Sequence, residues 1–200
     1  KVKTYLDYFP TDDLLDHPEY IEMIYPILVQ YTLSNDVDIT SLTGLFIQES
    51  GGNIYAVSPK GAAGLWQFMP GTARENNLEV PIYSKKINGI RYTLLNPIKD
   101  PRFDERFDVE KSTGAAIAFL LNLGNSFNEL DLILASYNSG ENRIKACMCI
   151  PNNGETPDFV KNIKLNIKEI NNIYEQLQKE KNLETYLESI ANETTEIPVF

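Results

Sequence analysis

The sequence predicts a mainly α-helical fold, and three observations lead to this prediction. Apolar residues recur every three or four positions, the spacing of an amphipathic helix, most clearly over residues 109–123. We find no convincing β-hairpin and no internal repeat. Apolar residues make up 42% and charged residues 23% of the 200 positions, which is typical of a globular protein long enough to bury a core.

The N-terminal part is expected to contain two helices. Residues 1–18 are acidic and rich in turn formers, and a helix is expected over residues 19–33. Pro26 lies inside that helix, so we expect a kink or two shorter pieces. The next helix begins at Asp38 or Thr40, because either side chain can cap it.

The middle of the chain combines loops with one clear helix. A glycine turn after Ser50 ends the preceding helix, and residues 54–70 form a loop punctuated by glycine and proline. A short helix is expected from Pro70, and residues 77–108 look irregular. A loop that long is usually functional or partly structured. The apolar spacing then predicts a helix that Gly124 ends.

The C-terminal part is helical again. Apolar spacing predicts a helix over residues 130–139 that Gly140 ends, and a further amphipathic helix over residues 163–177. A shorter candidate follows over residues 183–190, and the last ten residues resemble a tail.

The net charge of −10 is concentrated at the two ends of the chain. Residues 1–40 carry −6 and residues 150–200 carry −4, whereas residues 41–149 are balanced. A nucleic-acid binder needs a basic face, and so does adsorption to an anionic membrane, so both functions are disfavoured. No run of eighteen apolar residues is present, and no membrane-spanning helix is expected. Cys147 and Cys149 are expected to be ordinary thiols, with a local disulfide as the alternative.

Glu49 is the most informative polar residue. It follows Leu42, Leu45 and Phe46 by seven, four and three positions, which places its carboxylate on the apolar face of its helix. A carboxylate in apolar surroundings resists ionisation, so its pKa rises and it becomes a candidate general acid near neutral pH. The alternative is a helix-end glutamate that reaches solvent through the glycine turn.

Two further groups of residues suit a carbohydrate groove. Tyr137 faces inward by the same spacing rule, with Asn138 beside it, and its hydroxyl needs either a carboxylate or a backbone partner. Trp66, Gln67 and Phe68 lie in a glycine-flanked loop. Aromatic faces stack on sugars, an amide bonds their hydroxyl and N-acetyl groups, and glycines let the backbone approach a ligand. The alternative is that the aromatic residues belong to the core.

Other chemistries find little support in the sequence. The single histidine, His17, excludes a His-rich metal site and leaves a Ser/His triad dependent on a residue in an expected turn. No P-loop and no Gly-x-Gly-x-x-Gly segment is present. Residues 100–108 alternate in charge, so we expect a salt-linked surface loop rather than a metal site or a second catalytic carboxylate.

Three ordered motifs, with compatible gaps, resemble those of one enzyme family. The segments are Ile47–Gly51 with its Glu-Ser-Gly followed by residues 56–73, then residues 103–113, and finally Ala135–Gly140 with its Ala-Ser-Tyr-Asn-Ser-Gly followed by residues 155–160. They are similar to the catalytic domain of the soluble lytic transglycosylase family, above all its membrane-bound D-type subgroup. The resemblance covers roughly residues 40–165.

The resemblance implies a lysozyme-like helical fold, similar to goose-type lysozyme, and an activity. That activity is cleavage of the β-1,4 bond between N-acetylmuramic acid and N-acetylglucosamine in peptidoglycan, with formation of a 1,6-anhydro end. It implies Glu49 as acid and then base, and neither metal nor cofactor. The residues expected to bind or position the glycan are Ser50, Trp66, Gln67, Phe68, Tyr137 and Asn138.

Organisation, location and alternatives follow from the same resemblance and from the charge pattern. We expect an acidic helical extension over residues 1–35 packed on the domain, a catalytic domain over 36–165, and a C-terminal helical extension and tail over 166–200. The expected partners are peptidoglycan strands, with wall-associated proteins at the acidic ends. The expected location is the periplasm or envelope of a bacterium, with an outer-membrane anchor if the natural N-terminus is missing. The alternatives are a goose-type-lysozyme-like muramidase and an inactive peptidoglycan-binding scaffold.

Overall fold

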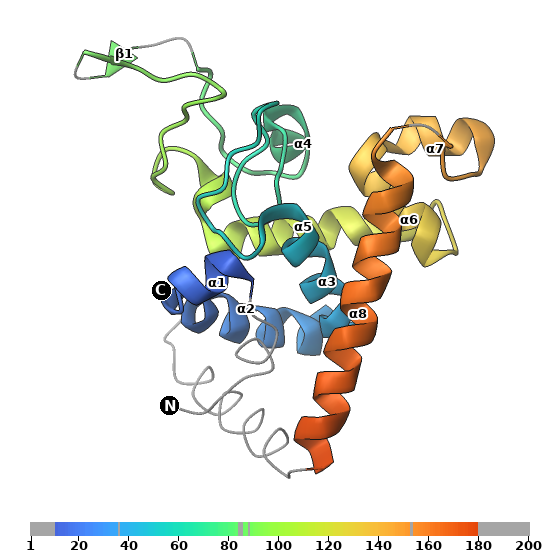
Figure 1. Cartoon of the computed structure of the whole chain (residues 1–200). Helices are drawn as coiled ribbons and strands as arrows, with labels where there is room; N and C mark the ends of the chain where they lie inside the picture. The colour runs from blue at the N-terminus through green and yellow to red at the C-terminus, as the bar shows by residue number, and fades with distance from the viewer. Residues whose placement is uncertain (1–10, 36, 84–85, 88, 153, 180–200) are drawn as a thin grey trace.

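The computed structural model describes residues 11–35, 37–83, 86–87, 89–152 and 154–179, and these residues are mostly helical (Figure 1). The prediction of a mainly α-helical fold is confirmed, whereas the candidate helix over 183–190 lies outside the described residues. In chain order the elements are α1 (Asp12–Asp16), α2 (Glu19–Asn35), α3 (Ile39–Ser50), α4 (Pro70–Glu75), β1 (Lys86–Ile87), β2 (Ile90–Arg91), the 3-10 helix η2 (Glu105–Phe107), α5 (Val109–Gly124), α6 (Leu130–Ser139), α7 (Glu141–Cys147) and α8 (Thr156–Lys179).

Helix α3 lies at the centre of the molecule and packs against the long α8. Leu42, Leu45 and Phe46 are fully buried, as their spacing predicts. The two helices approach so closely that a Cβ atom on Gly44 would lie 2.9 Å from the side chain of Ile167. This contact fixes the end of α3, and with it Glu49, relative to α8.

Helix α2 packs on α5 and α3, and it runs as one helix through Pro26. Of the two alternatives, a kink or two shorter pieces, the second is therefore wrong. Ile24 and Leu28, on either side of the proline, are completely buried in the core. Tertiary burial of an apolar helix face contributes more than the single backbone hydrogen bond that a proline removes.

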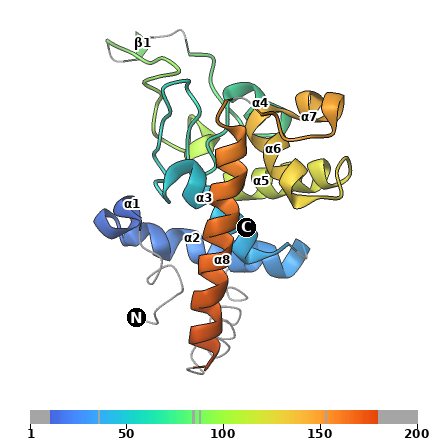
Figure 2. The ribbon, with the colours of Figure 1, turned by 45° about the vertical axis from the view of Figure 1, so that its right-hand side comes forward.

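A β-hairpin interrupts the long irregular segment, so the expectation of no hairpin is wrong. Strands β1 and β2 pair antiparallel with Lys86 opposite Arg91. The sequence does contain a hairpin signal, since Asn88-Gly89 is a preferred two-residue turn and Gly89 has a φ of +81°. In both views the hairpin projects from the end of the molecule that carries α4 and α7 (Figures 1 and 2).

A disulfide joins Cys147 and Cys149 at the end of α7, so the expectation of ordinary thiols is wrong and the local alternative holds. Met148 adopts a left-handed conformation with a φ of +49°, and the turn brings the two Cα atoms to 5.1 Å. Over the described part of the chain, no helix has both the length and the apolar character that crossing a bilayer requires.

Candidate active site

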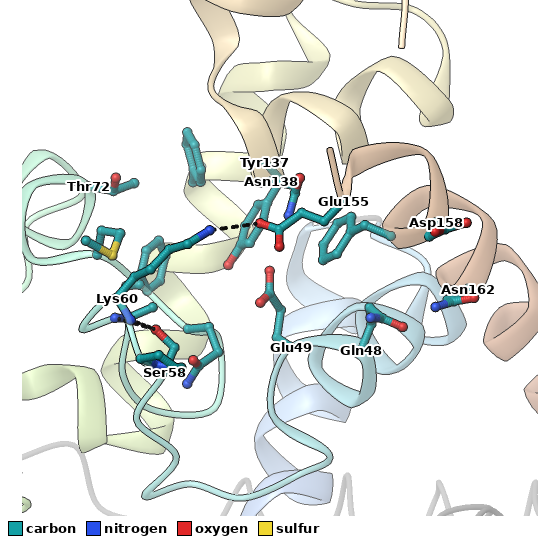
Figure 3. Close-up of a pocket in the computed structure, with 17 residues that line it drawn as sticks. Gln48, Glu49, Ser58, Lys60, Thr72, Tyr137, Asn138, Glu155, Asp158 and Asn162 are labelled. Atoms are coloured by element: carbon teal, nitrogen blue, oxygen red, sulfur yellow. Dashed lines mark hydrogen bonds and ion pairs between the residues drawn. The ribbon is translucent and has the colours of Figure 1, made fainter. Parts of the chain in front are cut away.

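A groove of about 610 Å³ opens beside the end of α3 (Figure 3). One wall is the loop before α4, residues 58–69, which we call the loop wall. The other walls come from α5 and α6 and from the first turns of α8. Five of the seven residues that the sequence predicts for the site line this one groove. They are Glu49, Gln67, Phe68, Tyr137 and Asn138.

Glu49 occupies the last turn of α3, and its carboxylate points into the groove (Figure 3). The Asp38 side chain caps the start of α3, and Gly51, with a φ of +64°, ends it. Burial and, to a lesser extent, the negative charge of Glu155 together raise the pKa of Glu49 from its ordinary value of 4.5 to about 8. Glu49 therefore keeps its proton at neutral pH, which is what a general acid requires.

Tyr137 connects α6 to the loop wall of the groove. Its hydroxyl donates a 2.9 Å hydrogen bond to the carbonyl oxygen of Trp66, so the partner is the backbone rather than a carboxylate. Its ring packs against Phe119 and Phe68, with ring centres 5.3 and 6.2 Å away. Burial and the nearby Glu49 carboxyl raise the pKa of Tyr137 well above its ordinary value, so the phenol stays neutral.

Gln67 and Asn138 are held by hydrogen bonds to their own surroundings. Gln67 has a φ of +49°, and its side-chain amide donates to the carbonyl oxygens of Gly64 and Ala56 at 2.9 and 3.3 Å. Asn138 accepts a 2.7 Å hydrogen bond from the hydroxyl of Thr156. Both groove-lining side chains are therefore fixed before any ligand arrives, which limits the entropy lost on binding.

Ser50 and Trp66, expected to bind the glycan, do not line the groove. The Ser50 hydroxyl donates to the carbonyl oxygen of Phe46 at 3.1 Å and accepts from the backbone N–H of Gly52. Trp66 is completely buried, and its indole N–H donates a 2.9 Å hydrogen bond to Thr113. The polar atoms of both side chains are therefore used inside the fold and are not offered to a ligand.

Three charged residues of the groove, Lys60, Glu155 and Asp158, were not singled out from the sequence as site residues. The Lys60 ammonium lies 3.4 Å from the Glu155 carboxylate, so the pair joins the loop wall to the start of α8 (Figure 3). They are 95 positions apart in the chain, and only the tertiary fold brings them together. The sequence did offer a signal for Glu155, because it lies in the motif over residues 155–160. Within the described residues, no group of three or more His, Cys, Asp or Glu side chains is placed to hold a metal ion.

The family model described as "Transglycosylase SLT domain" matches residues 27–156, which contain Glu49 and most of the groove. The chain belongs to the transglycosylase SLT domain family. The match begins within α2 and ends at the first residue of α8, so both the end of α3 and the loop wall lie inside the SLT region.

Two curated relatives are similar to part of this chain. Both are named "Membrane-bound lytic murein transglycosylase D", one from Escherichia coli strain K12 and one from Escherichia coli O6:H1. Each is 32% identical over 115 residues, which is 56% of this chain and 21% of the relative. The chain therefore spans about a fifth of the length of the relatives that it matches.

Proposed function

We propose that this SLT domain is the catalytic domain of a peptidoglycan lytic transglycosylase. The proposed substrate is the β-1,4 bond between N-acetylmuramic acid and N-acetylglucosamine, and the proposed product carries a 1,6-anhydro-N-acetylmuramic acid end. The observation that carries the proposal is the carboxyl group of Glu49, which is directed into a preformed groove and whose pKa is raised to about 8, mainly by burial. Family membership and the name of the relatives support the same substrate class.

The reaction uses Glu49 twice. As an acid, Glu49 protonates the glycosidic oxygen, the bond from this oxygen to C1 of the muramic residue breaks, and the bonding electrons leave with the oxygen. As a carboxylate, Glu49 then accepts the proton of the C6 hydroxyl of the same sugar, whose oxygen forms a new bond to C1. No water is consumed, and Glu49 is returned to its protonated state. An internal nucleophile benefits from a high effective concentration, so a second carboxylate is not required.

The other groove residues have supporting roles in this proposal. Phe119 provides apolar surface for the sugar faces, whereas Phe68 is 3% exposed and supports the groove from the core. Asn138 and Gln67 offer amide groups to hydroxyl and N-acetyl groups. Tyr137 maintains the apolar environment of Glu49 and keeps the loop wall in place. Its role is to keep the Glu49 carboxyl partly dry, which favours the protonated form.

Product analysis on purified sacculi tests the proposal. Wild-type protein is expected to release anhydro-muropeptides, and Glu49→Gln is expected to fold normally and release none. Glu75→Gln, at an exposed position on α4, is the matched control and is expected to act like wild type. Reducing ends, heavier by one water or about 18 mass units, would instead identify a hydrolase. Binding to sacculi without any product would identify a scaffold.

Location and organisation are proposed on the same basis. We propose a periplasmic or envelope location in a bacterium, because the substrate class lies there. The three-part division at residues 35 and 165 stays a prediction, and position 165 lies inside the continuous helix α8. The acidic ends remain proposed contacts for wall-associated proteins. Recovery of such proteins by wild-type protein but not by Asp12→Asn/Asp16→Asn, which removes exposed charges and keeps the buried helix α2, would support this role.

A further inference from the structure

The segment of alternating charges at residues 100–108 contains two Asp-x-Arg pairs with different surroundings. The Asp100–Arg102 pair lies at the surface, as the sequence predicts, and the Arg102 side chain is 82% exposed. The Asp104–Arg106 pair is completely buried, so the expectation of a surface loop is wrong for this half. Arg106 donates to both Asp104 carboxylate oxygens, at 3.0 and 2.7 Å.

Arg106 makes two further contacts, and both go to the loop wall of the groove. One terminal nitrogen of its guanidinium donates to the carbonyl oxygens of Gly61 and Phe68, at 2.9 and 3.1 Å. Between these two points the loop lies directly on the Arg106 backbone, since a Cβ atom on Gly64 would be 1.8 Å from the Arg106 carbonyl oxygen. Arg106 therefore holds both ends of the segment that contains Gln67.

Asp104 and Tyr83 complete this buried network. The Tyr83 hydroxyl donates to the Asp104 carboxylate, and the Asp104 carboxylate also accepts from the backbone N–H of Arg106. If the Asp104–Arg106 pair served only to satisfy its own buried charges, Arg106 would not need its two hydrogen bonds to the loop. A lysine in place of the arginine has no planar fork and cannot bond the carboxylate and the loop with the same geometry.

We propose that Arg106, oriented by Asp104 and Tyr83, is a positioning residue that fixes the loop wall of the groove relative to Glu49. Arg106 does not line the groove and acts through Gln67 and Phe68, which do. Groups that bind substrate must be held within a fraction of an ångström, and a displacement of about 1 Å can lower the rate by about 100-fold. The kinetic part of this inference rests on the proposed function.

The kinetic test compares the two Asp-x-Arg pairs with soluble, uncross-linked glycan strands as substrate. Arg106→Lys is expected to lower kcat/KM by about 10- to 100-fold. The matched control Arg102→Lys, with the same spacing at the surface, is expected to remain within about twofold of wild type. The alkaline limb of the pH profile is expected to stay in place in Arg106→Lys, because the hydrogen bonds of the Arg106 side chain go to Asp104 and to the loop and not to Glu49. Equal activity of Arg106→Lys and wild type would refute the proposal.

The second test separates positioning from stability and does not depend on activity. Trp66 is the only tryptophan and lies in the loop between the two contacts of Arg106, so its fluorescence reports on this loop. A buried ion pair can often be replaced by apolar residues without loss of stability, so Asp104→Leu/Arg106→Met serves as the fold-preserving variant. Tyr83→Phe, which removes one hydroxyl, serves as a milder one.

Both variants are expected to keep a cooperative thermal transition, while acrylamide quenching of Trp66 increases at least twofold in the double variant. A double variant that unfolds with wild-type cooperativity and shows wild-type quenching and activity overturns the proposal. If the double variant does not fold, Tyr83→Phe decides the question through the same quenching and kinetics. If wild-type protein releases no anhydro product, the proposed function fails, and the tryptophan measurement alone decides the positioning role.

Discussion

Replacing Glu49 by glutamine is expected to stabilise the folded protein. A carboxyl group whose folded pKa lies above its unfolded value favours folding fully below the unfolded pKa, and this contribution is lost as the pH rises through the folded pKa. For Glu49 the two values are 4.5 and about 8, with burial as the main cause. The wild-type protein is therefore destabilised progressively between pH 4.5 and about pH 8, whereas glutamine carries no charge at any pH.

The size of the effect follows from the two pKa values. One pKa unit corresponds to about 1.4 kcal/mol, so the destabilisation by Glu49 is about 3 kcal/mol at pH 7 and approaches about 5 kcal/mol above pH 8. It is close to zero below pH 4.5. These figures are upper bounds, because part of the Glu49 side chain is exposed to solvent, and solvent stabilises the charged form.

Urea unfolding followed through the Trp66 fluorescence measures this difference. The difference in unfolding free energy between Glu49→Gln and wild type is expected to be near zero at pH 4 and to grow steadily up to pH 8. Other titrating groups cancel in the comparison, and Glu75→Gln, at an exposed position, is expected to show no such trend. Equal stability of Glu49→Gln and wild type at pH 8 would refute the idea that a buried carboxyl group is held protonated in the groove.

Two further predictions concern the groove and its loop. Activity needs protonated Glu49, so it is expected to fall as the pH rises through about 8, and Glu155→Gln is expected to move this alkaline limb to lower pH because a nearby negative charge is removed. If the alkaline limb of the pH–rate profile lies at the same pH in Glu155→Gln as in wild type, the assignment of this limb to Glu49 is contradicted. Gly64→Ala is expected to lower the unfolding free energy by more than about 3 kcal/mol, because the new Cβ atom would lie 1.8 Å from a backbone oxygen at a φ of +80°. Gly71→Ala, whose Cβ atom meets nothing within 4 Å, is the control and is expected to be neutral or slightly stabilising in urea unfolding.

Local sequence spacing determined the helices and the orientation of the key carboxyl group. The apolar period places Glu49 and Tyr137 on the inner faces of α3 and α6, because a helix repeats every 3.6 residues whatever surrounds it. The hairpin was also encoded locally, in Asn88-Gly89, and it was missed because its strands are only two residues long.

Long-range contacts decided the remaining features. An alternating run of charges looks solvent-exposed, and nothing local distinguishes the surface pair Asp100–Arg102 from the buried residue Arg106. Arg106 differs from Arg102 because it donates hydrogen bonds to the carbonyl oxygens of Gly61 and Phe68, about 40 positions earlier in the chain. Only the folded loop brings these oxygens to it. Trp66 is a second example. A tryptophan suits either a sugar groove or a core, and here the ring is buried in the core, where its N–H bonds to the distant Thr113.

The sequence by itself determined the helices and the inward orientation of Glu49 and Tyr137, since helical period is a property of neighbouring positions. The tertiary structure alone decided how strongly Glu49 holds its proton and what fixes the wall opposite it. Both depend on groups distant in the chain, such as Glu155 and Arg106, and desolvation and charge act through space rather than along the sequence.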